Sequence, residues 1–209
     1  RPVSLILDAG VSIDRLRLET TLDGTVMARL TVSNATGAAW RGMVELEATA
    51  DNHDGAGASI TLPAAIPLGE SMIEAQLCIP QPRLWWPWDH GDPNLYRLTT
   101  RLQDESGAVY DQRENPFGIR TVRLERSSER FTYFINERPV AVRGSSYMPG
   151  LYLSQYSGAA LAHDVALARE ANLNLMRVHV HVSPPEFYDL CDRAGMLVFQ
   201  DFELNWVQD

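Results

Sequence analysis

Polar side chains that could contact a substrate gather near the end of this 209-residue chain. Arg177, His179 and His181 occupy the end of one short apolar segment, and Asp201 follows the next. If both segments are parallel strands, these side chains share a carboxyl-terminal edge, where open α/β sheets and barrels bind ligands. A guanidinium there can bind a carboxylate, either as a structural ion pair or as part of a binding site.

The elements that would position these residues read as strand, helix, strand. Residues 173–182 alternate in polarity as a strand does, and Pro185 suits the first turn of a helix. Residues 186–194 carry apolar side chains at helical spacing, and Gly195 stands where a helix often ends in a left-handed turn. Residues 196–199 form the short apolar run that is typical of a buried parallel strand.

The two histidines permit a second interpretation. Strand alternation predicts that His179 and His181 point the same way, and such a pair can bind a metal ion. A third ligand is not evident in the sequence. We therefore expect no metal and no cofactor, and we expect His181 to pack within a loop.

The first 120 residues have the pattern of an antiparallel β-sandwich. Short alternating segments are separated by turn sequences such as Asp23-Gly24 and Ser106-Gly107. The sequence lacks the Cys–Trp–Cys arrangement of an antibody domain, so immunoglobulin-like describes the expected architecture alone. The seven expected strands are residues 3–7, 13–20, 26–33, 43–50, 71–79, 95–103 and 109–113.

Two segments of this region have both a functional and a structural interpretation. Residues 51–57 (DNHDGAG) offer oxygen ligands for calcium, but they lack the spacing of an EF-hand loop, and a hairpin tip is favoured. Residues 83–98 contain three of the five tryptophans, whose rings could stack on sugars. Because these tryptophans lie beside two prolines and a glycine, we favour a structural role in which their rings plug the end of the sandwich core.

The rest of the chain is expected to be α/β. Residues 121–130 mark the boundary, and a hairpin then leads into a strand at 140–143. Residues 143–150 (RGSSYMPG) are expected to form the loop after that strand, and residues 158–172 a helix. The resulting order of strand, helix, strand, helix, strand implies right-handed parallel units.

Composition excludes several function classes. The hydrophobic content of 45% predicts a packed core, and the net charge of −9 disfavours binding to nucleic acid. No apolar run approaches 18 residues, so a membrane span is not expected. We interpret Cys78 and Cys191 as reduced, buried thiols, which slightly favours the cytoplasm while leaving the location undetermined.

Several stretches, in this order, are similar to motifs of glycoside hydrolase family 2, which includes β-galactosidases, β-glucuronidases and β-mannosidases. They are Arg1-Pro2-Val3, Leu84-Trp85-Trp86-Pro87 with Gly91, Pro93, Leu95 and Tyr96, Phe117-Gly118-Ile119-Arg120, and Phe134-Ile135-Asn136 with Arg143-Gly144. Residues 174–195 then resemble the second strand and helix of the family's barrel. Residues 197–202 (LVFQDF) are most similar to the third strand of β-mannosidases and exo-β-glucosaminidases.

The resemblance implies an immunoglobulin-like antiparallel β-sandwich at residues 1–122, followed at 123–209 by the first strands and helices of an incomplete (β/α)8 barrel with about three strands. It implies a retaining exo-β-glycosidase, whose two catalytic glutamates sit on later barrel strands. Asn136-Glu137 has the letters of the family's acid/base pair but falls in a hairpin turn. We therefore expect an internal fragment, inactive by itself, with no catalytic residue among these 209.

The resemblance also implies roles for five residues in binding a carbohydrate substrate. Arg177 would be the electrostatic partner of the nucleophilic carboxylate, and His179 would contact sugar hydroxyls. Asp201 would bind a substrate hydroxyl or orient a neighbouring residue. Tyr147 and Ser146 stand where the family often has Trp and Asn after its first strand. The β-mannosidase pattern has tryptophan at the place of His179, so a mannose preference is doubtful.

Two other hypotheses remain open. The chain could be a stand-alone carbohydrate-binding or adhesion module that uses its tryptophans. It could also be a complete small α/β enzyme that uses His179, Asp201 and Glu203. Three parallel strands without further neighbours would leave an open edge, so we also expect self-association.

Overall fold

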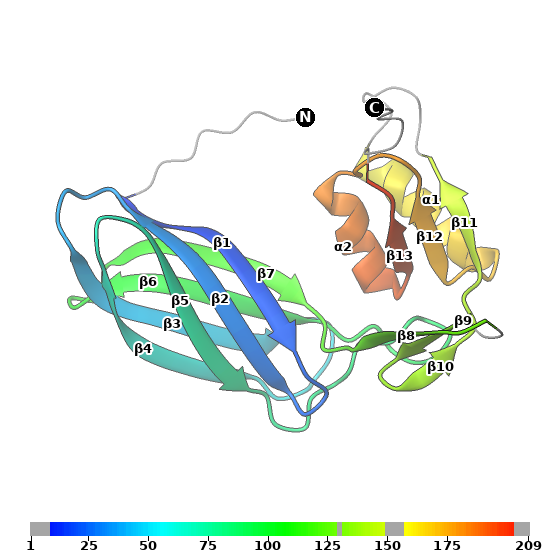
Figure 1. Ribbon diagram of the computed structural model, residues 1–209, viewed down its shortest axis with the longest axis horizontal. Coiled ribbons are helices and arrows are strands. Elements are labelled where there is room, and N and C mark those ends of the chain that lie inside the picture. The colour runs from blue at the N-terminus through cyan, green and yellow to red at the C-terminus, as the bar shows by residue number, and fades with distance from the viewer. Residues whose placement is uncertain (1–8, 129–130, 149–156, 203–209) are drawn as a thin grey trace. The chain divides into compact units, whose positions relative to one another are not determined.

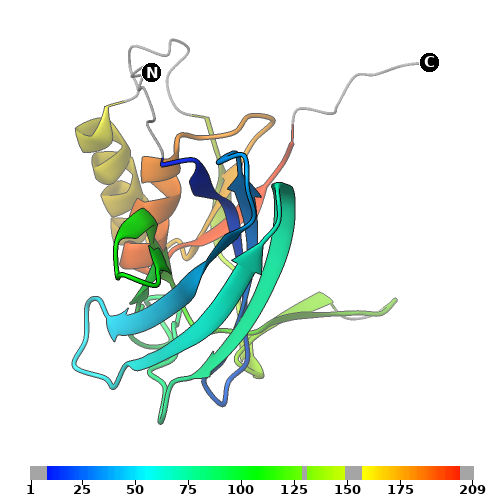
Figure 2. The ribbon, with the colours of Figure 1, turned by 90° about the vertical axis from the view of Figure 1, so that its left-hand side faces the viewer.

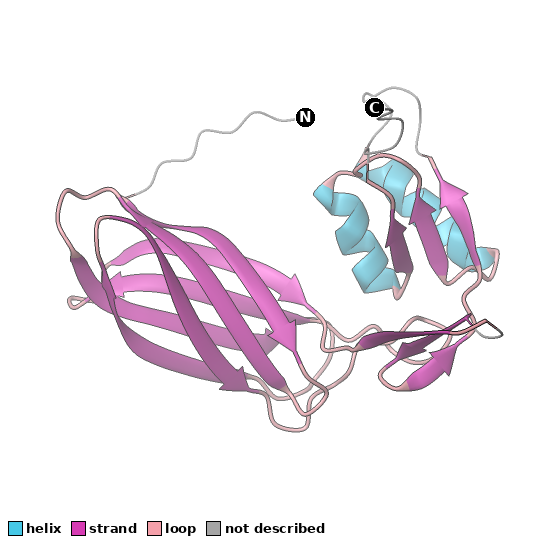
Figure 3. Cartoon of the chain, in the orientation of Figure 1, coloured by secondary structure: helices cyan, strands magenta, loops and turns pink. Residues whose placement is uncertain are grey.

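The computed structural model describes residues 9–128, 131–148 and 157–202. The chain is mostly β-sheet with two helices in this described part (Figure 3). It divides into two compact units, each discontinuous in sequence. The all-β unit comprises residues 2–83 and 95–119, and the mixed unit comprises residues 84–94 and 120–209. In the described residues, no helix is both long and apolar enough to cross a membrane.

The all-β unit contains two antiparallel sheets, with strand orders β1-β2-β5 and β4-β3-β6-β7 (Figure 1). Side chains along β2 and β3 alternate between buried and partly exposed, which places one face of each sheet in the core. The strands are β1 (Val11–Thr20), β2 (Thr25–Asn34), β3 (Trp40–Ala50), β4 (Ala58–Ile66), β5 (Gly69–Cys78), β6 (Tyr96–Asp104) and β7 (Val109–Phe117).

Six of these strands overlap predicted ones, and the predicted strand at 3–7 lies outside the described residues. Strand β4 was not predicted, because Pro63 and several alanines weaken its strand pattern. The position of β4 explains why a strand can contain Pro63. Among the described residues, β4 pairs with β3 alone and forms a sheet edge, where proline is accepted. Cys78 is exposed at the end of β5, so its expected burial was wrong.

Residues 51–57 connect the antiparallel strands β3 and β4, which confirms the predicted hairpin tip. The polar side chains of this loop bind the protein itself. Asp51 Oδ1 lies 2.5 Å from Arg97 Nη2, and Asn52 Oδ1 accepts a hydrogen bond from the Leu95 amide at 2.7 Å. These oxygens stabilise the loop, so the calcium interpretation loses two of its candidate ligands.

The mixed unit begins with an antiparallel sheet of order β10-β9-β8. Its strands are β8 (Val122–Arg126), β9 (Phe131–Ile135) and β10 (Arg138–Val140). The predicted turn joins β9 to β10, since Asn136 and Glu137 both have positive φ, at 48° and 62°. The strand expected at 140–143 is therefore the end of this hairpin and not the first parallel strand.

The parallel sheet has the order β11-β12-β13, with strands β11 (Gly144–Tyr147), β12 (Leu175–Val178) and β13 (Leu197–Gln200). Strand β11 occupies part of the segment that was predicted to be a loop. Helices α1 (Gly158–Glu170) and α2 (Pro185–Ala194) alternate with the strands and lie side by side (Figures 1 and 2). The predicted order of parallel units is therefore present, but its first strand is shifted by four residues.

Both helices begin with residues that suit a helix start. The Ser157 side chain accepts a hydrogen bond from the Ala160 amide at the start of α1, and Pro185 occupies the first turn of α2. Helix α2 ends as predicted, with Gly195 left-handed at φ 68°. A side chain at this position would also collide, since its Cβ would lie 2.7 Å from the Trp88 amide nitrogen.

A separate core joins the helices to the parallel sheet. Its buried members come from α1, β12, α2 and the start of β13: Leu161, Val165, Met176, Val178, Phe187, Cys191 and Met196. Leu167 of α1 is apolar, but it is 48% exposed. The apolar face of α1 is thus narrower than its sequence pattern predicted.

The tryptophan segment belongs to the mixed unit, which corrects its expected place in the sandwich core. Trp85 is fully buried, and its indole N–H donates to the Asp192 carbonyl at 2.8 Å. The indole N–H of Trp88 donates to the Leu173 carbonyl at 2.9 Å. Asp192 lies in the last turn of α2, where backbone carbonyls lack helical partners, so the tryptophan satisfies a group that needs one.

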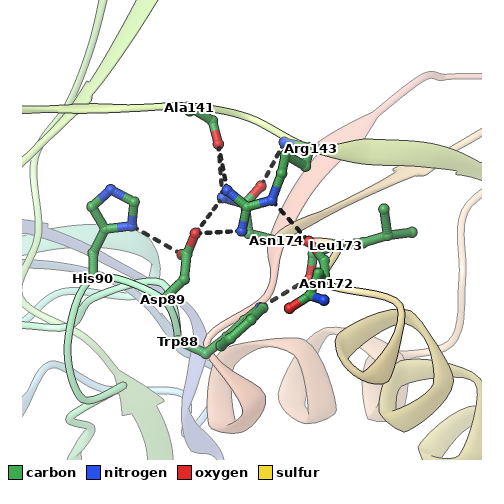
Figure 4. A network of polar contacts seen from close by, with 8 residues as sticks. All are labelled: Trp88, Asp89, His90, Ala141, Arg143, Asn172, Leu173 and Asn174. Atoms are coloured by element: carbon green, nitrogen blue, oxygen red, sulfur yellow. Dashed lines mark hydrogen bonds and ion pairs between the residues drawn. The ribbon is translucent and has the colours of Figure 1, made fainter.

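Asp89 lies at the centre of the polar network next to these tryptophans (Figure 4). Its Oδ2 atom lies 2.7 Å from Arg143 Nη2 and accepts a hydrogen bond from Asn174 Nδ2 at 3.0 Å. Its Oδ1 atom lies 2.9 Å from His90 Nδ1. Burial raises the pKa of Asp89, but the hydrogen bonds from His90, Arg143 and Asn174 outweigh it and lower the pKa overall.

These contacts fix the amino ends of the parallel strands. Arg143 directly precedes β11, and the fully buried Asn174 directly precedes β12. The Trp88 amide donates to the Gly195 carbonyl at 3.0 Å, two residues before β13. One eleven-residue segment, 84–94, therefore contacts the start of all three strands.

We predict that Asp89→Asn lowers the free energy of unfolding by about 2 kcal/mol near neutral pH, since hydrogen bonds to a charged group contribute about 1.5–3 kcal/mol each. The folded pKa of Asp89 lies below its unfolded value, so this stabilisation is complete above the unfolded pKa. It disappears as the pH falls through the folded pKa. Urea unfolding followed by tryptophan fluorescence, near neutral pH and in acid, measures both effects.

Asp54→Asn is the matched control. Asp54 is 92% exposed, and its ion pair with Arg83, at 3.4 Å, contributes little because solvent screens it. We expect that variant to change the free energy of unfolding by less than about 0.5 kcal/mol. Equal stability of the Asp89 and Asp54 variants near neutral pH would show that the network does not stabilise the fold.

Candidate functional site

The three parallel strands are in register, and their residues form rows across the sheet. Ser146, Arg177 and Phe199 share one row, and Tyr147, Val178 and Gln200 share the next. Val178 is fully buried in the helix-covered core, whereas Arg177 and Phe199 are exposed. Since side chains alternate along a strand, Ser146 and Arg177 lie on the face opposite the helices.

Arg177, His179 and Asp201 meet at the carboxyl-terminal edge of this sheet, as the sequence predicted. Arg177 Nη2 lies 2.6 Å from Asp201 Oδ2, and His179 Nδ1 lies 3.5 Å from the same oxygen. The side chains are 45%, 38% and 21% exposed for Arg177, His179 and Asp201. We call these three residues, together with Ser146, the strand-end site.

Backbone hydrogen bonds bring the two strand ends together. The His179 amide donates to the Tyr147 carbonyl at 3.2 Å, and the Asp201 amide donates to the Val178 carbonyl at 3.0 Å. Both bonds continue the parallel ladders one residue beyond the strands. His179 and Asp201 are therefore held by main-chain geometry, and their side chains point to a common place.

Asp201 is ionised at neutral pH. The hydrogen bond from Arg177 is the largest influence on its carboxyl group and lowers its pKa, and the positive charge of Arg177 adds to the effect. An ionised carboxylate accepts hydrogen bonds only, whereas the guanidinium only donates. The site thus presents donors and an acceptor side by side, which suits a ligand rich in hydroxyl groups.

Tyr147 is not part of this cluster. Its ring stacks on Phe187 in the helix-covered core, with centroids 5.0 Å apart and planes 7° from parallel. Its hydroxyl group donates to Asp164 Oδ2 of α1 at 2.9 Å. Tyr147 lies within β11, on the opposite face from Arg177, and its role in binding a carbohydrate stays a prediction.

His181 packs within a loop, as predicted. Strand β12 ends at Val178, and Val180 has a positive φ of 51°, so the expected alternation of His179 and His181 does not hold. His181 Nδ1 lies 2.9 Å from the His179 carbonyl, and its Nε2 lies 3.1 Å from Ser183 Oγ. Both ring nitrogens of His181 are engaged within the protein.

The described residues contain no group of three His, Cys, Asp or Glu side chains arranged to hold a metal. Glu203, the second carboxylate of the small-enzyme hypothesis, lies outside the described residues. Glycosidases of the common type need two carboxyl groups across the scissile bond. In the described part of the strand-end site, Asp201 supplies one.

Two residues that hold this site together had no predicted role. Gln200, the last residue of β13, donates through Nε2 to the carbonyls of His181 and Asp201, both at 2.7 Å. The hydroxyl group of Tyr188 in α2 donates to Gln200 Oε1 at 2.6 Å. A polar residue at the end of an apolar strand was the available signal, but the sequence did not show which loop it would bind.

Comparison with known proteins places this geometry in a family. The family model described as glycosyl hydrolases family 2 matches residues 11–120, about half of the chain. An exo-β-D-glucosaminidase of Amycolatopsis orientalis is 31% identical over 124 residues, which cover 59% of this chain and 12% of that protein. Beta-mannosidase B of Aspergillus terreus is 31% identical over 131 residues, covering 59% of this chain and 15% of that protein.

A solved structure supports the same assignment over a longer part of the chain. The β-D-mannosidase of Dictyoglomus thermophilum superposes with a TM-score of 0.83 and 26% identity, covering 93% of this chain and 24% of that one. The chain therefore spans a quarter or less of the length of these three relatives. Because the family model covers more than half of its residues, the chain belongs to glycosyl hydrolases family 2.

Proposed function

We propose that this chain is part of a retaining exo-β-glycosidase that hydrolyses terminal β-linked sugars. In this proposal, the all-β unit is an immunoglobulin-like sandwich, and residues 123–209 open a (β/α)8 barrel. Support comes from the two antiparallel sheets of the all-β unit and from the three parallel strands that alternate with helices. Relatives named exo-β-D-glucosaminidase and β-mannosidase agree with a sugar-cleaving parent.

The observation that carries the proposal is the exposed ion pair between Arg177 and Asp201, 2.6 Å apart at neighbouring strand ends. Ligands of (β/α)8 barrels bind at this edge of the strands. We propose that Asp201 accepts a hydrogen bond from a sugar hydroxyl and that His179 and Ser146 contact neighbouring hydroxyls. Arg177 orients Asp201 here and would face the nucleophilic carboxylate of the complete site.

The 209-residue chain is proposed to lack catalysis of its own. A (β/α)8 barrel has eight strands, and the described residues contain three parallel ones. Retaining glycosidases place two carboxyl groups about 5–5.5 Å apart, and Asp201 is paired with Arg177 instead of a second acid. The strand-end site thus fits substrate binding without bond cleavage.

The alternative of a stand-alone carbohydrate-binding module depends on tryptophan rings. Trp85 is fully buried, and the guanidinium of Arg120 lies 4.4 Å from its ring centroid. Arg138 lies 4.9 Å from the ring centroid of Trp86, and Arg169 lies 5.4 Å from that of Trp88. Each of these rings packs against an arginine within the mixed unit, which supports the strand-end site as the proposed place of sugar contact.

We predict that the purified chain does not hydrolyse aryl β-glycosides of glucosamine, mannose or galactose. The physical reason is that the described residues place no second carboxyl group beside Asp201. Release of nitrophenol above the uncatalysed rate, with loss of that activity in Asp201→Asn, would contradict the prediction and favour the small-enzyme hypothesis. An unaffected Asp201→Asn variant with the same activity would point to a contaminating enzyme.

We predict weak, millimolar binding of a monosaccharide at the strand-end site. Titration with glucosamine, mannose and galactose should shift the NMR signals of Ser146, Arg177, His179 and Asp201. Asp201→Asn should weaken this binding at least fivefold, because it removes the charged acceptor. Asp104→Asn, in a turn of the all-β unit, serves as the control. Shifts confined to Trp85, Trp86 and Trp88 would instead establish the module hypothesis.

We predict that the chain associates with itself through the free side of β13. Within the described residues β13 pairs only with β12, and Phe199 is 46% exposed on it. Phe199, Leu175 and Leu197 also line a pocket of about 290 Å³ together with Val122. Light scattering should show mass increasing with concentration, because exposed strand edges and apolar patches pair.

The matched variants are Phe199→Lys, which should restore a monomer, and Met72→Lys, which should not. Met72 is 70% exposed, but it lies on β5 in the all-β unit. A monomer at all concentrations, with slow amide exchange through β12 and β13, would show that this edge is closed.

A further inference from the structure

The chain makes a strained turn directly behind the strand-end site. Val180 has a φ of 51°, in the left-handed region that β-branched residues rarely adopt. Such a conformation persists only where surrounding contacts impose it. The turn lies between His179, which approaches Asp201, and His181, which packs in the loop.

The contacts that impose this turn come from three side chains. His181 Nδ1 lies 2.9 Å from the His179 carbonyl and so spans the strained residue. Gln200 Nε2 lies 2.7 Å from the carbonyls of His181 and Asp201. Because carbonyl oxygens only accept, Nε2 is the donor to both, and one side chain connects the loop after β12 to the loop after β13.

Tyr188 completes the arrangement from helix α2. With Nε2 of Gln200 committed to two carbonyls, its Oε1 atom accepts from the Tyr188 hydroxyl at 2.6 Å. The same hydroxyl oxygen accepts a hydrogen bond from the Ser183 amide at 3.3 Å. Ser183 is 3% exposed, so its polar groups depend on partners within the protein. The tyrosine thus holds both Gln200 and the far end of the loop.

We propose that Tyr188 and Gln200 are positioning residues of the strand-end site. They hold the turn at Val180, which places His179 beside Asp201 for contact with a sugar hydroxyl. Neither residue need touch the ligand, because each acts through the backbone of the two loops. This inference rests on the proposed function for its ligand class, whereas the loop clamp itself can be tested without a sugar.

The test uses the full chain with Tyr188→Phe, Gln200→Leu and the double variant. Tyr188→Phe removes only the hydroxyl and keeps the edge-to-face contact of the ring with Phe187, whose centroid is 5.5 Å away. Residue-resolved amide exchange should accelerate at least tenfold at Ser183 in each single variant. Amides of α1, α2 and β12 should stay within about twofold of the parent chain, since the core is unchanged.

Two further measurements separate positioning from general stability. The imidazole signal of His179 should shift in both single variants, although no hydrogen bond joins it to Tyr188 or Gln200 in the described contacts. The double variant should exchange no faster at Ser183 than Tyr188→Phe, because that substitution already removes the hydroxyl through which Gln200 acts on the Ser183 amide. Tyr110→Phe, whose ring packs on Trp40 in the all-β unit, is the matched control and should leave both readouts unchanged.

Unchanged exchange at Ser183 in both single variants would overturn the clamp, as would an unmoved His179 signal. Loss of protection throughout α1 and α2 would also overturn it, because Tyr188 would then be a core residue only. Sugar titration is read separately. If the parent chain binds no sugar, the proposed function loses its binding site, and the exchange data still decide whether the clamp exists.

Discussion

Buried hydrogen-bonding groups at the amino ends of three parallel strands need partners, and the segment 84–94 supplies them. Asp89 binds the side chains of Arg143 and Asn174, and Trp88 binds the backbone before β12 and before β13. An unpaired buried group would cost about 1–3 kcal/mol, so these contacts decide whether the short strands can pair at all. The strands have four residues each and offer few ladder bonds of their own.

The parallel sheet thus depends on a segment that lies far from it in the sequence. The flanks of the segment, residues 83 and 95, belong to the all-β unit, whereas the segment itself belongs to the mixed unit. The mixed unit therefore cannot be produced as residues 120–209 alone without losing Asp89, the carboxylate partner of Arg143 and Asn174. Tryptophans that looked like a sugar platform are committed to this packing, because their N–H groups satisfy carbonyls at helix and strand ends.

The two ends of the parallel sheet carry different kinds of charge pair. At the amino end, Asp89 is 13% exposed and surrounded by donors, which gives a rigid connection. At the carboxyl end, the Arg177–Asp201 pair is more open, and the neighbouring turn at Val180 is strained. Backbone strain of this kind costs stability, and such strained residues cluster at active sites and ligand-binding sites. This difference agrees with an amino end that stabilises the sheet and a carboxyl end that is proposed to bind a ligand.

The sequence by itself determined the succession of elements and the place of the polar edge at the carboxyl ends of the parallel strands. Alternation and turn residues predicted six of the seven strands of the all-β unit, and proline, glycine and helical spacing predicted α2 almost to its ends. Arg177, His179 and Asp201 were predicted to meet because carboxyl ends of parallel strands share an edge. These features depend on local periodicity, which a sequence displays directly.

Only the tertiary structure decided which face and which unit each side chain joins. Strand β11 begins at Gly144, four residues later than predicted, and this register sends Tyr147 to the helices instead of the sugar edge. The unit of the tryptophans, the partners of Asp89 and the clamp of Tyr188 with Gln200 all involve residues distant in sequence or across a turn. Such pairings depend on where free carbonyls and donors lie in space, and no periodicity within one segment records that.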